Sequence, residues 1–186
     1  MSNMSAIKEK VAHEKTGGKN RVLVVNNNDT VRRTLLTHLS DACFQADGVD
    51  FEGAFTRLDE SAHKTGLRER ERQEGLFPGF LDSLEPFQNV DVLVVDRGEA
   101  ASDGVLEGDR LLVQLKGMRP DIPIVVTSME KPPEWKEHEG GTLTRADDFY
   151  LNNVAQHVSP TGYLQHPFSP QRLITAVSEV TRKETA

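Results

Sequence analysis

Short apolar runs alternate along the chain with stretches in which apolar residues recur at helical spacing. Three runs are rich in Val or Ile and do not alternate strictly with polar residues: RVLVV at 21–25, VDVLVVD at 90–96 and IPIVVTS at 122–128. Continuous runs of this kind are typical of parallel strands covered on both faces of a sheet. GYLQHPF at 162–168 is a fourth strand candidate, and a weaker fifth candidate is VDFEGAF at 49–55.

Helical patterns lie between and after these runs. The apolar residues that repeat on one helix face are Val31, Leu35, Leu36 and Leu39; Leu111, Leu112, Leu115 and Met118; and Leu173, Ile174, Val177 and Val180. Strands that alternate with helices indicate right-handed βαβ units. The pattern therefore predicts an α/β protein with a doubly wound parallel sheet.

Length, charge and cysteine content narrow the classes of protein. A chain of 186 residues suits one domain with a buried core. Its formal net charge of −7 argues against a surface that neutralises nucleic-acid phosphates. Residues 1–20 hold no apolar run that fits a signal peptide, and no later stretch is long and apolar enough to cross a bilayer. We expect a cytoplasmic protein that binds neither nucleic acid nor membrane.

Cys43 is the single cysteine, so an internal disulfide and a thiolate metal cluster are both excluded. Its neighbours Ala42 and Phe44 predict that it is a small buried side chain rather than a redox group.

Ligands of open α/β sheets bind outside the carboxyl ends of the strands, so the residues that end the strands are the candidates for chemistry. They are Asn26, Asn27 and Asn28 after the first strand, Asp96 after the third, Thr127 and Ser128 after the fourth, and His166 with Pro167 after the fifth. Asp29 and Thr30 follow the asparagines directly and predict an N-cap for the first helix.

This order of residues resembles the receiver domains of two-component response regulators. In that family an acidic pair ends the first strand, a phospho-accepting Asp the third, a Ser or Thr the fourth, and a Lys followed by Pro the fifth. The similar segments are VVNNNDTVRRTL, DVLVVD, IPIVVTS and GYLQHPFSPQRL, and the Asp103-Gly104 pair has the family's spacing after Asp96. The resemblance implies a flavodoxin-like, doubly wound five-stranded parallel sheet with helices on both faces.

The resemblance also implies roles for individual residues. Asp96 is the candidate phospho-acceptor, Thr127 stands at the hydroxyl position and His166 stands at the lysine position. Tyr163 falls on the aromatic switch position. In the family the positions of Thr127 and Tyr163 couple phosphorylation to the face formed by the fourth helix and the fifth strand, so that face is the expected docking surface.

The implied Mg²⁺ site is degenerate, because Asn26 and Asn27 replace the acidic pair. The remaining ligands would be the carboxylate of Asp96 and the backbone carbonyl of Gly98, and Mg²⁺ prefers such oxygen ligands. Each lost charge is worth roughly 8 kcal/mol gross at about 4 Å and an effective dielectric near 20, before desolvation. We expect metal binding to be weak or absent. His166 weakens the site further, since imidazole is shorter than the lysine side chain and largely neutral at pH 7.

Two functions stay open. The favoured one is a pseudo-receiver: a signal-transduction module that is not an enzyme, needs no cofactor and acts through protein–protein interaction without phosphorylation. The alternative is a phosphorelay response regulator that takes a phosphoryl group on Asp96 with Mg²⁺. In the first case Asp96 is a carboxylate hydrogen-bonded to Asn27 or His166. A redox carrier is a poor third candidate, because NNNDTV offers one hydroxyl and no glycine to cradle a phosphate.

The expected partner is a signalling protein: a histidine kinase, an output protein or another receiver-like chain, with pairing of two copies also open. We divide the chain into a flexible tail at 1–20, a receiver-like domain at 21–182 and a short tail at 183–186. Stretches near 63–87 and 131–161 are longer than the family usually has and are expected insertions.

Overall fold

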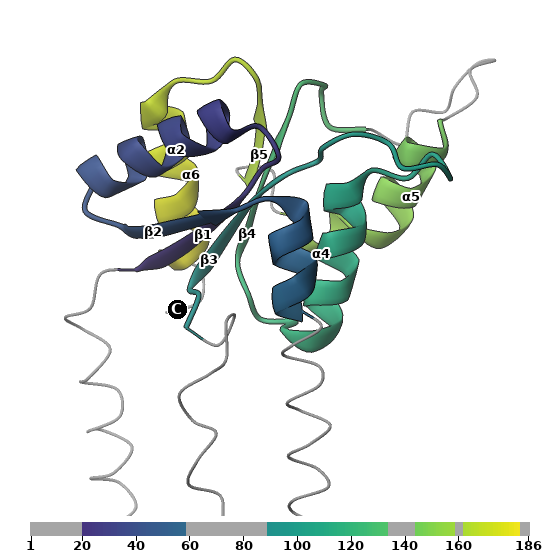
Figure 1. The fold of residues 1–186 in the computed structure, drawn as a ribbon, viewed down its shortest axis with the longest axis horizontal. Coiled ribbons are helices and arrows are strands. Elements are labelled where there is room, and N and C mark those ends of the chain that lie inside the picture. Colours follow the sequence, from purple (N-terminus) through teal and green to yellow (C-terminus); the bar gives the residue numbers. More distant parts are fainter. Residues whose placement is uncertain (1–19, 59–88, 134–143, 159–161, 183–186) are drawn as a thin grey trace, which may run out of the picture.

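The computed structural model describes residues 20–58, 89–133, 144–158 and 162–182, which form one sheet with helices on both faces (Figure 1). The strands are β1 (Arg21–Val25), β2 (Gln45–Val49), β3 (Val92–Asp96), β4 (Ile124–Ser128) and β5 (Tyr163–Gln165). All four neighbouring pairs are parallel, and the order across the sheet is β2-β1-β3-β4-β5. The predicted five-stranded, doubly wound parallel sheet is confirmed.

Three of the helices named here follow the predicted apolar repeats, whereas the helix at Arg145–Asn153 was not predicted. The named helices are α2 (Asp29–Asp41), α4 (Glu107–Met118), α5 (Arg145–Asn153) and α6 (Pro170–Arg182), with a short 3₁₀ turn, η2, at Ala155–His157. Residues 51–58 are also helical. None of the helices in the described part of the chain is long and apolar enough to cross a membrane.

Several predictions about domain organisation lie outside the described residues. These are most of the tail at 1–20, all of the insertion at 63–87, the tail at 183–186, and parts of the insertion at 131–161. The described residues of that last insertion include α5 and η2.

The strand predicted at 49–55 is wrong. The second strand ends at Val49, and a helix follows it at once. Phe51, Ala54 and Leu58 are buried at helical spacing, while the alternation of apolar residues over the same segment imitates a strand. Asp50 favours the helix, because its side chain accepts a hydrogen bond from the Gly53 backbone N–H at 2.8 Å.

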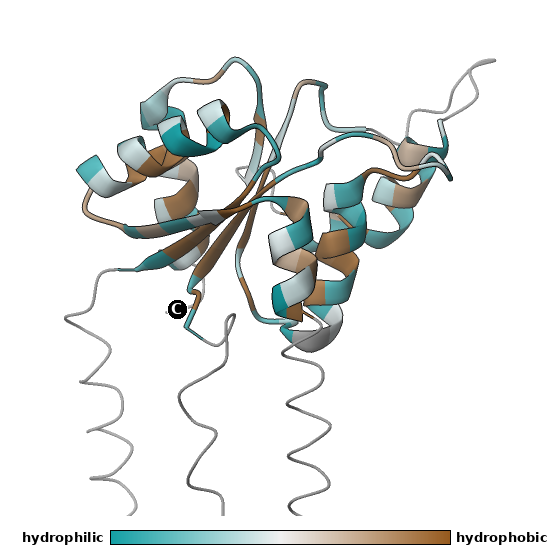
Figure 2. Cartoon of the chain, in the orientation of Figure 1, coloured by the Kyte–Doolittle hydropathy of each residue, from teal (hydrophilic) through white to brown (hydrophobic). Residues whose placement is uncertain are grey.

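Two apolar clusters, one on each face of the sheet, hold the helices in place. Alternate strand residues supply them, so Leu23 and Val25 face one side while Val22 and Val24 face the other. The 51–58 helix, α4 and α5 cover the first face, and α2 and α6 cover the second (Figure 1). Figure 2 shows the apolar residues concentrated along the strands and on the helix surfaces that meet them.

The prediction that Cys43 is buried is wrong. Its side chain is exposed, and its backbone has a φ of 67°. The residue follows the C-cap of α2, where its N–H donates to the Ser40 carbonyl at 3.0 Å. Helices commonly end in this left-handed conformation, which here directs the thiol outward while Phe44 packs against the core.

Candidate functional site

The register of the sheet brings the candidate residues of three strands to one edge. Val25 pairs with Val95, and Asp96 pairs with Thr127. Asn26, Asp96 and Thr127 therefore end neighbouring strands side by side, at the carboxyl edge where ligands of such sheets bind.

Each oxygen of the Asp96 carboxylate accepts one hydrogen bond from a neighbouring residue. Oδ1 accepts a hydrogen bond from the Thr127 hydroxyl at 3.0 Å, and Oδ2 accepts one from the Gly98 backbone N–H at 3.0 Å. The predicted hydrogen bond to Asn27 or His166 is wrong. Gly98 has a φ of 71°, and this left-handed turn directs its N–H back toward the carboxylate.

Each of the three asparagines has a hydrogen-bonding role within the protein. Asn26 Oδ1 accepts from the Asn28 backbone N–H at 2.7 Å, and Asn28 Oδ1 accepts from the Val31 N–H at 3.1 Å. Asn28 is thus the N-cap of α2, which corrects the predicted cap at Asp29 and Thr30. Asp29 lies in the first turn instead.

Asn27 connects two elements that are distant in the sequence. Its Oδ1 accepts from the Phe51 backbone N–H at 2.9 Å, and its Nδ2 donates to Glu107 Oε2 at 3.2 Å. Because a backbone N–H can only donate, the amide oxygen must face Phe51 and the NH₂ group must face Glu107. An aspartate at this position would instead meet the Glu107 carboxylate with a like charge.

These groups do not fit a divalent cation. The amide oxygens of Asn26 and Asn27 face backbone donors, and the Arg32 guanidinium lies 2.6 Å from the Asn26 carbonyl oxygen. A fixed positive charge at this distance opposes a second cation nearby. Within the described ranges, no three acidic, histidine or cysteine side chains converge in a way that could hold a metal ion.

His166 follows β5 at the same edge of the sheet, but its ring packs against Phe168. The His166 backbone N–H donates to the Ser128 carbonyl at 2.8 Å, which continues the pairing of β4 with β5. The ring stacks on Phe168 with centroids 4.4 Å apart. Both rings line an apolar cavity of about 220 Å³ between α2 and α6, together with Leu35 and Leu173.

Tyr163, at the predicted switch position, is held inside the protein. Its side chain is largely buried, and its hydroxyl donates to the Glu130 carbonyl at 3.2 Å. Its ring meets the Tyr150 ring edge to face, with centroids 6.1 Å apart. Burial raises the pKa of both tyrosines, so both phenols are neutral at physiological pH.

A buried ion pair next to Asp96 is the feature that the sequence analysis missed. Arg97 and Asp109 are 1% and 0% exposed, and they form two hydrogen bonds: Nε to Oδ1 at 3.1 Å and Nη2 to Oδ2 at 2.9 Å. The Arg97 guanidinium also lies 4.4 Å from the Tyr150 ring centroid. A signal was present, because Asp109 precedes Leu112 by three residues and so shares the buried face of the helix.

Burial and pairing act in opposite directions on this pair. Burial alone lowers the pKa of Arg97, but the hydrogen bonds and the charge of Asp109 outweigh it and raise that pKa. Burial raises the pKa of Asp109, and Arg97 opposes the change. The third guanidinium nitrogen, Nη1, is buried without a hydrogen-bond partner among the described residues.

Gly108 allows α4 to begin directly against the end of β3. A Cβ atom there would lie 2.0 Å from the Asp96 carbonyl oxygen, which no side chain tolerates. The Gly108 N–H donates to the Arg97 carbonyl at 3.0 Å. This close approach brings Glu107 to Asn27 and Asp109 to Arg97.

Comparisons with known proteins agree with this architecture. No protein-family model matches the chain, and no curated protein sequence matches it. Among solved structures, a response regulator receiver protein from Sinorhizobium medicae matches with a TM-score of 0.54 at 17% identity, covering 88% of this chain and 95% of that one. A receiver domain protein from Clostridium thermocellum matches with a TM-score of 0.53 at 14% identity, over 89% and 97% of the two chains.

A CheY-like receiver domain protein from Methanospirillum hungatei gives a TM-score of 0.56 at 13% identity, over 90% of this chain and 98% of the other. At such low identities the likeness concerns the fold. The parallel strand order and the strand-end positions of Asp96 and Thr127 point the same way. The chain therefore has the fold of response regulator receiver domains.

Proposed function

We propose that this protein is a receiver-like signalling module that acts by binding another protein, without phosphoryl transfer and without catalytic chemistry of its own. The observation that carries the proposal is the hydrogen bonding of Asn26 and Asn27. Their side-chain amides form hydrogen bonds within the protein, at the positions where the receiver family has two metal-binding carboxylates.

The charges around Asp96 support the same conclusion. Phosphoryl transfer to a carboxylate needs cations that neutralise the transferring group. Here the lysine position is His166, whose ring stacks on Phe168, and the Arg32 guanidinium is bonded to Asn26 and Asp29. Neither side chain is hydrogen-bonded to the Asp96 carboxylate, which is bonded to Thr127 and Gly98.

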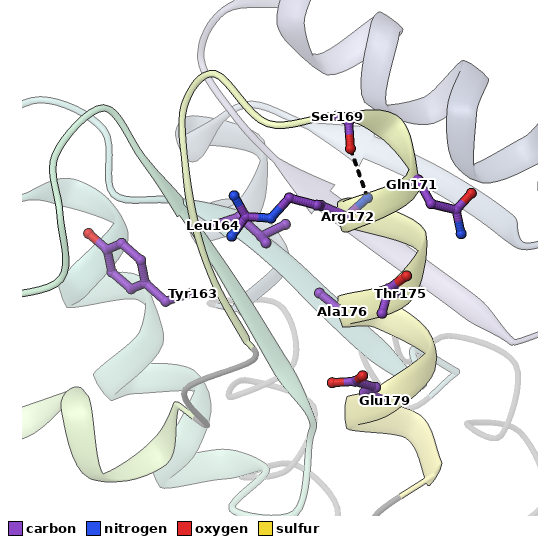
Figure 3. Close-up of a pocket in the computed structure, with 8 residues that line it drawn as sticks. All are labelled: Tyr163, Leu164, Ser169, Gln171, Arg172, Thr175, Ala176 and Glu179. Carbon is purple, nitrogen blue, oxygen red and sulfur yellow. Dashed lines mark hydrogen bonds between the residues drawn. The ribbon is translucent and has the colours of Figure 1, made fainter.

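The binding surface we favour lies along β5, an outer strand of the sheet. A groove of about 410 Å³ runs between β5 and α6 (Figure 3). Arg172 extends across this groove toward Leu164, while the Tyr163 ring points away from α6 (Figure 3). Met129, just beyond β4, is 77% exposed and is the most exposed large apolar side chain in the described part of the chain. An exposed apolar side chain beside an open strand is a suitable contact for a partner protein.

The partner on this proposal is a signalling protein: a histidine kinase, an output protein, or another receiver-like chain, including a second copy. Sedimentation at several protein concentrations separates the last case from the others, because only self-association makes the apparent mass depend on concentration.

Intact mass spectrometry with acetyl phosphate and Mg²⁺ tests the proposal. We expect no phosphoryl adduct on the folded wild type or on Asp96→Asn, and no amide shifts at Asp96 or Thr127 on adding beryllofluoride. An adduct on the wild type that disappears in Asp96→Asn would contradict the proposal. It would instead support the alternative, a phosphorelay component with Asp96 as nucleophile.

A further inference from the structure

A buried chain of contacts runs from the end of β3 to β5. Arg97 follows Asp96 and pairs with Asp109 of α4. Its guanidinium lies over the ring of Tyr150, in α5, and the Tyr150 ring supports the Tyr163 ring of β5. The chain therefore links the candidate site to the side of the protein where we expect a partner to bind.

The contact with Arg97 supports one of the buried side chains of α5. The helix has nine residues, and within it only Tyr150 and Leu151 are buried. Tyr150 packs on Arg97 through a cation–π contact, which is strongest when the charge is removed from water, as it is here. One of the two buried side chains of α5 is thus packed on the charged side chain of Arg97, the residue that follows β3.

Stability alone is a poor explanation for the ion pair. A buried pair often contributes no more than apolar side chains of similar volume would, and one guanidinium nitrogen here has no partner in the described ranges. The pair does fix the orientation of Arg97, because two hydrogen bonds to one carboxylate hold the plane of the guanidinium.

We infer that Arg97 is a positioning residue, which holds Tyr150 and Tyr163 in one arrangement through its ion pair with Asp109, so that the α5–β5 side is preformed without chemistry at Asp96. The inference deepens the proposed function and rests on it in one respect, the use of this side for partner binding. Packing on the opposite face, between α2 and α6, plays no part in it.

The test follows the ionisation of Tyr163 by its absorbance near 295 nm. Tyr150 and Tyr163 are the two tyrosines in the sequence, so the substitution Tyr150→Phe leaves Tyr163 as the sole phenol and keeps the ring that it packs on. In this background Arg97→Met with Asp109→Leu removes both charges and keeps apolar volume. Circular dichroism checks that each variant is folded.

The two explanations predict opposite results. If Arg97 positions the tyrosines, the double substitution releases Tyr163 to solvent, and its pKa falls toward the ordinary value near 10. If the pair is only packing, Tyr163 stays buried. Its pKa then stays raised, because burial is the main cause of the shift and the lowering influence of Arg97 is larger than the raising influence of Asp109. A folded variant with an unchanged or higher tyrosine pKa would overturn the inference.

Two further variants serve as a control for general destabilisation and as a replacement if the double variant does not fold. Leu173→Ala destabilises the opposite face and should leave the Tyr163 titration unchanged, so it separates release of Tyr163 from general loosening. If the double variant does not fold, Arg97→Lys takes its place, because it keeps the charge but loses the planar fork. A folded Arg97→Lys protein with an unchanged titration also overturns the inference. The titration involves neither Asp96 nor a partner, so a phosphoryl adduct on Asp96 would contradict the proposed function and not this result.

Discussion

The two faces of the sheet are held by different kinds of interaction. Between the sheet and helices α2 and α6 the buried contacts are apolar, with Leu39, Leu173 and Val177 at the centre. On the opposite face, the apolar cluster includes Tyr150, whose ring contacts the buried Arg97–Asp109 ion pair. Apolar packing has no preferred direction and tolerates substitutions of similar volume, whereas an ion pair with two hydrogen bonds fixes one geometry. Tyr163 packs on the face with the directional contact, and it lies in β5, the outer strand along which we expect a partner to bind.

The largest effect is expected when one charge of the ion pair is removed. Asp109→Leu leaves the Arg97 guanidinium buried without its partner and should cost about 3–5 kcal/mol of unfolding free energy. Adding Arg97→Met should restore most of this loss, because no buried charge then remains. Urea denaturation of both single variants and the double variant measures the coupling. Equal losses in the single and double variants would contradict the assignment of the cost to an unpaired charge.

On the apolar face, Leu173→Ala should cost about 3 kcal/mol, since it removes a fully buried side chain and leaves a cavity. Leu173→Met, with similar volume, should cost under about 1.5 kcal/mol. The same denaturation experiment gives both values. If Leu173→Met lowers the unfolding free energy as much as Leu173→Ala does, then this face tolerates substitution no better than the face with the ion pair. That result would contradict the difference between the two faces.

A smaller effect is expected at the carboxyl edge. Asn27→Asp places a carboxylate against Glu107 and loses the hydrogen bond between them, which should lower stability by about 0.5–1 kcal/mol at pH 7. Adding Glu107→Gln should recover the loss, because a glutamine can donate to the new carboxylate. Thermal melting of the three proteins measures the difference, and an Asn27→Asp protein as stable as the wild type would contradict the described contact.

The smallest effect is spectroscopic and needs no substitution. Burial raises the pKa of Tyr150 and Tyr163, so the folded protein should show little tyrosinate absorbance near pH 10, where an exposed tyrosine is half ionised. Their contribution to stability is complete below the ordinary tyrosine pKa and is lost as the pH rises above it, because the unfolded chain releases these protons first. Tyrosinate that appears near pH 10 in the folded protein would show that these rings are exposed.

Much of the fold was predictable because it depends on local patterns. The apolar runs at β1, β3 and β4 and the helical repeats at α2, α4 and α6 carry their own signals. The edge strand β2 lacks such a signal, since its sequence, QADGV, is largely polar and gains its structure from pairing with β1. The alternating residues that follow it therefore suggested a strand where the helix at 51–58 lies.

The candidate site was predictable in its members but not in its bonds. The sheet topology brings the strand ends that carry Asn26, Asp96 and Thr127 to one edge. The alternation of strands and helices in the sequence predicts that topology. The hydrogen bond between Asn27 and Glu107 joins residues 80 positions apart, and no local pattern indicates it. Asp96 binds Gly98 rather than Asn27 because of one left-handed backbone turn. Such contacts depend on the backbone conformation of the loops, which the pattern of apolar residues in the sequence does not predict.

A titration with Mg²⁺, followed by the amide shifts of Asn26, Asn27 and Gly98, tests most directly whether hydrogen-bonded amides have taken the place of a metal site. The matched control is Asn26→Asp with Asn27→Asp, which restores the two carboxylates of the receiver family. We expect no saturable shifts in the wild type at millimolar Mg²⁺ and tighter Mg²⁺ binding in the control. Saturable shifts in the wild type, centred on these residues and lost in Asp96→Asn, would contradict this expectation.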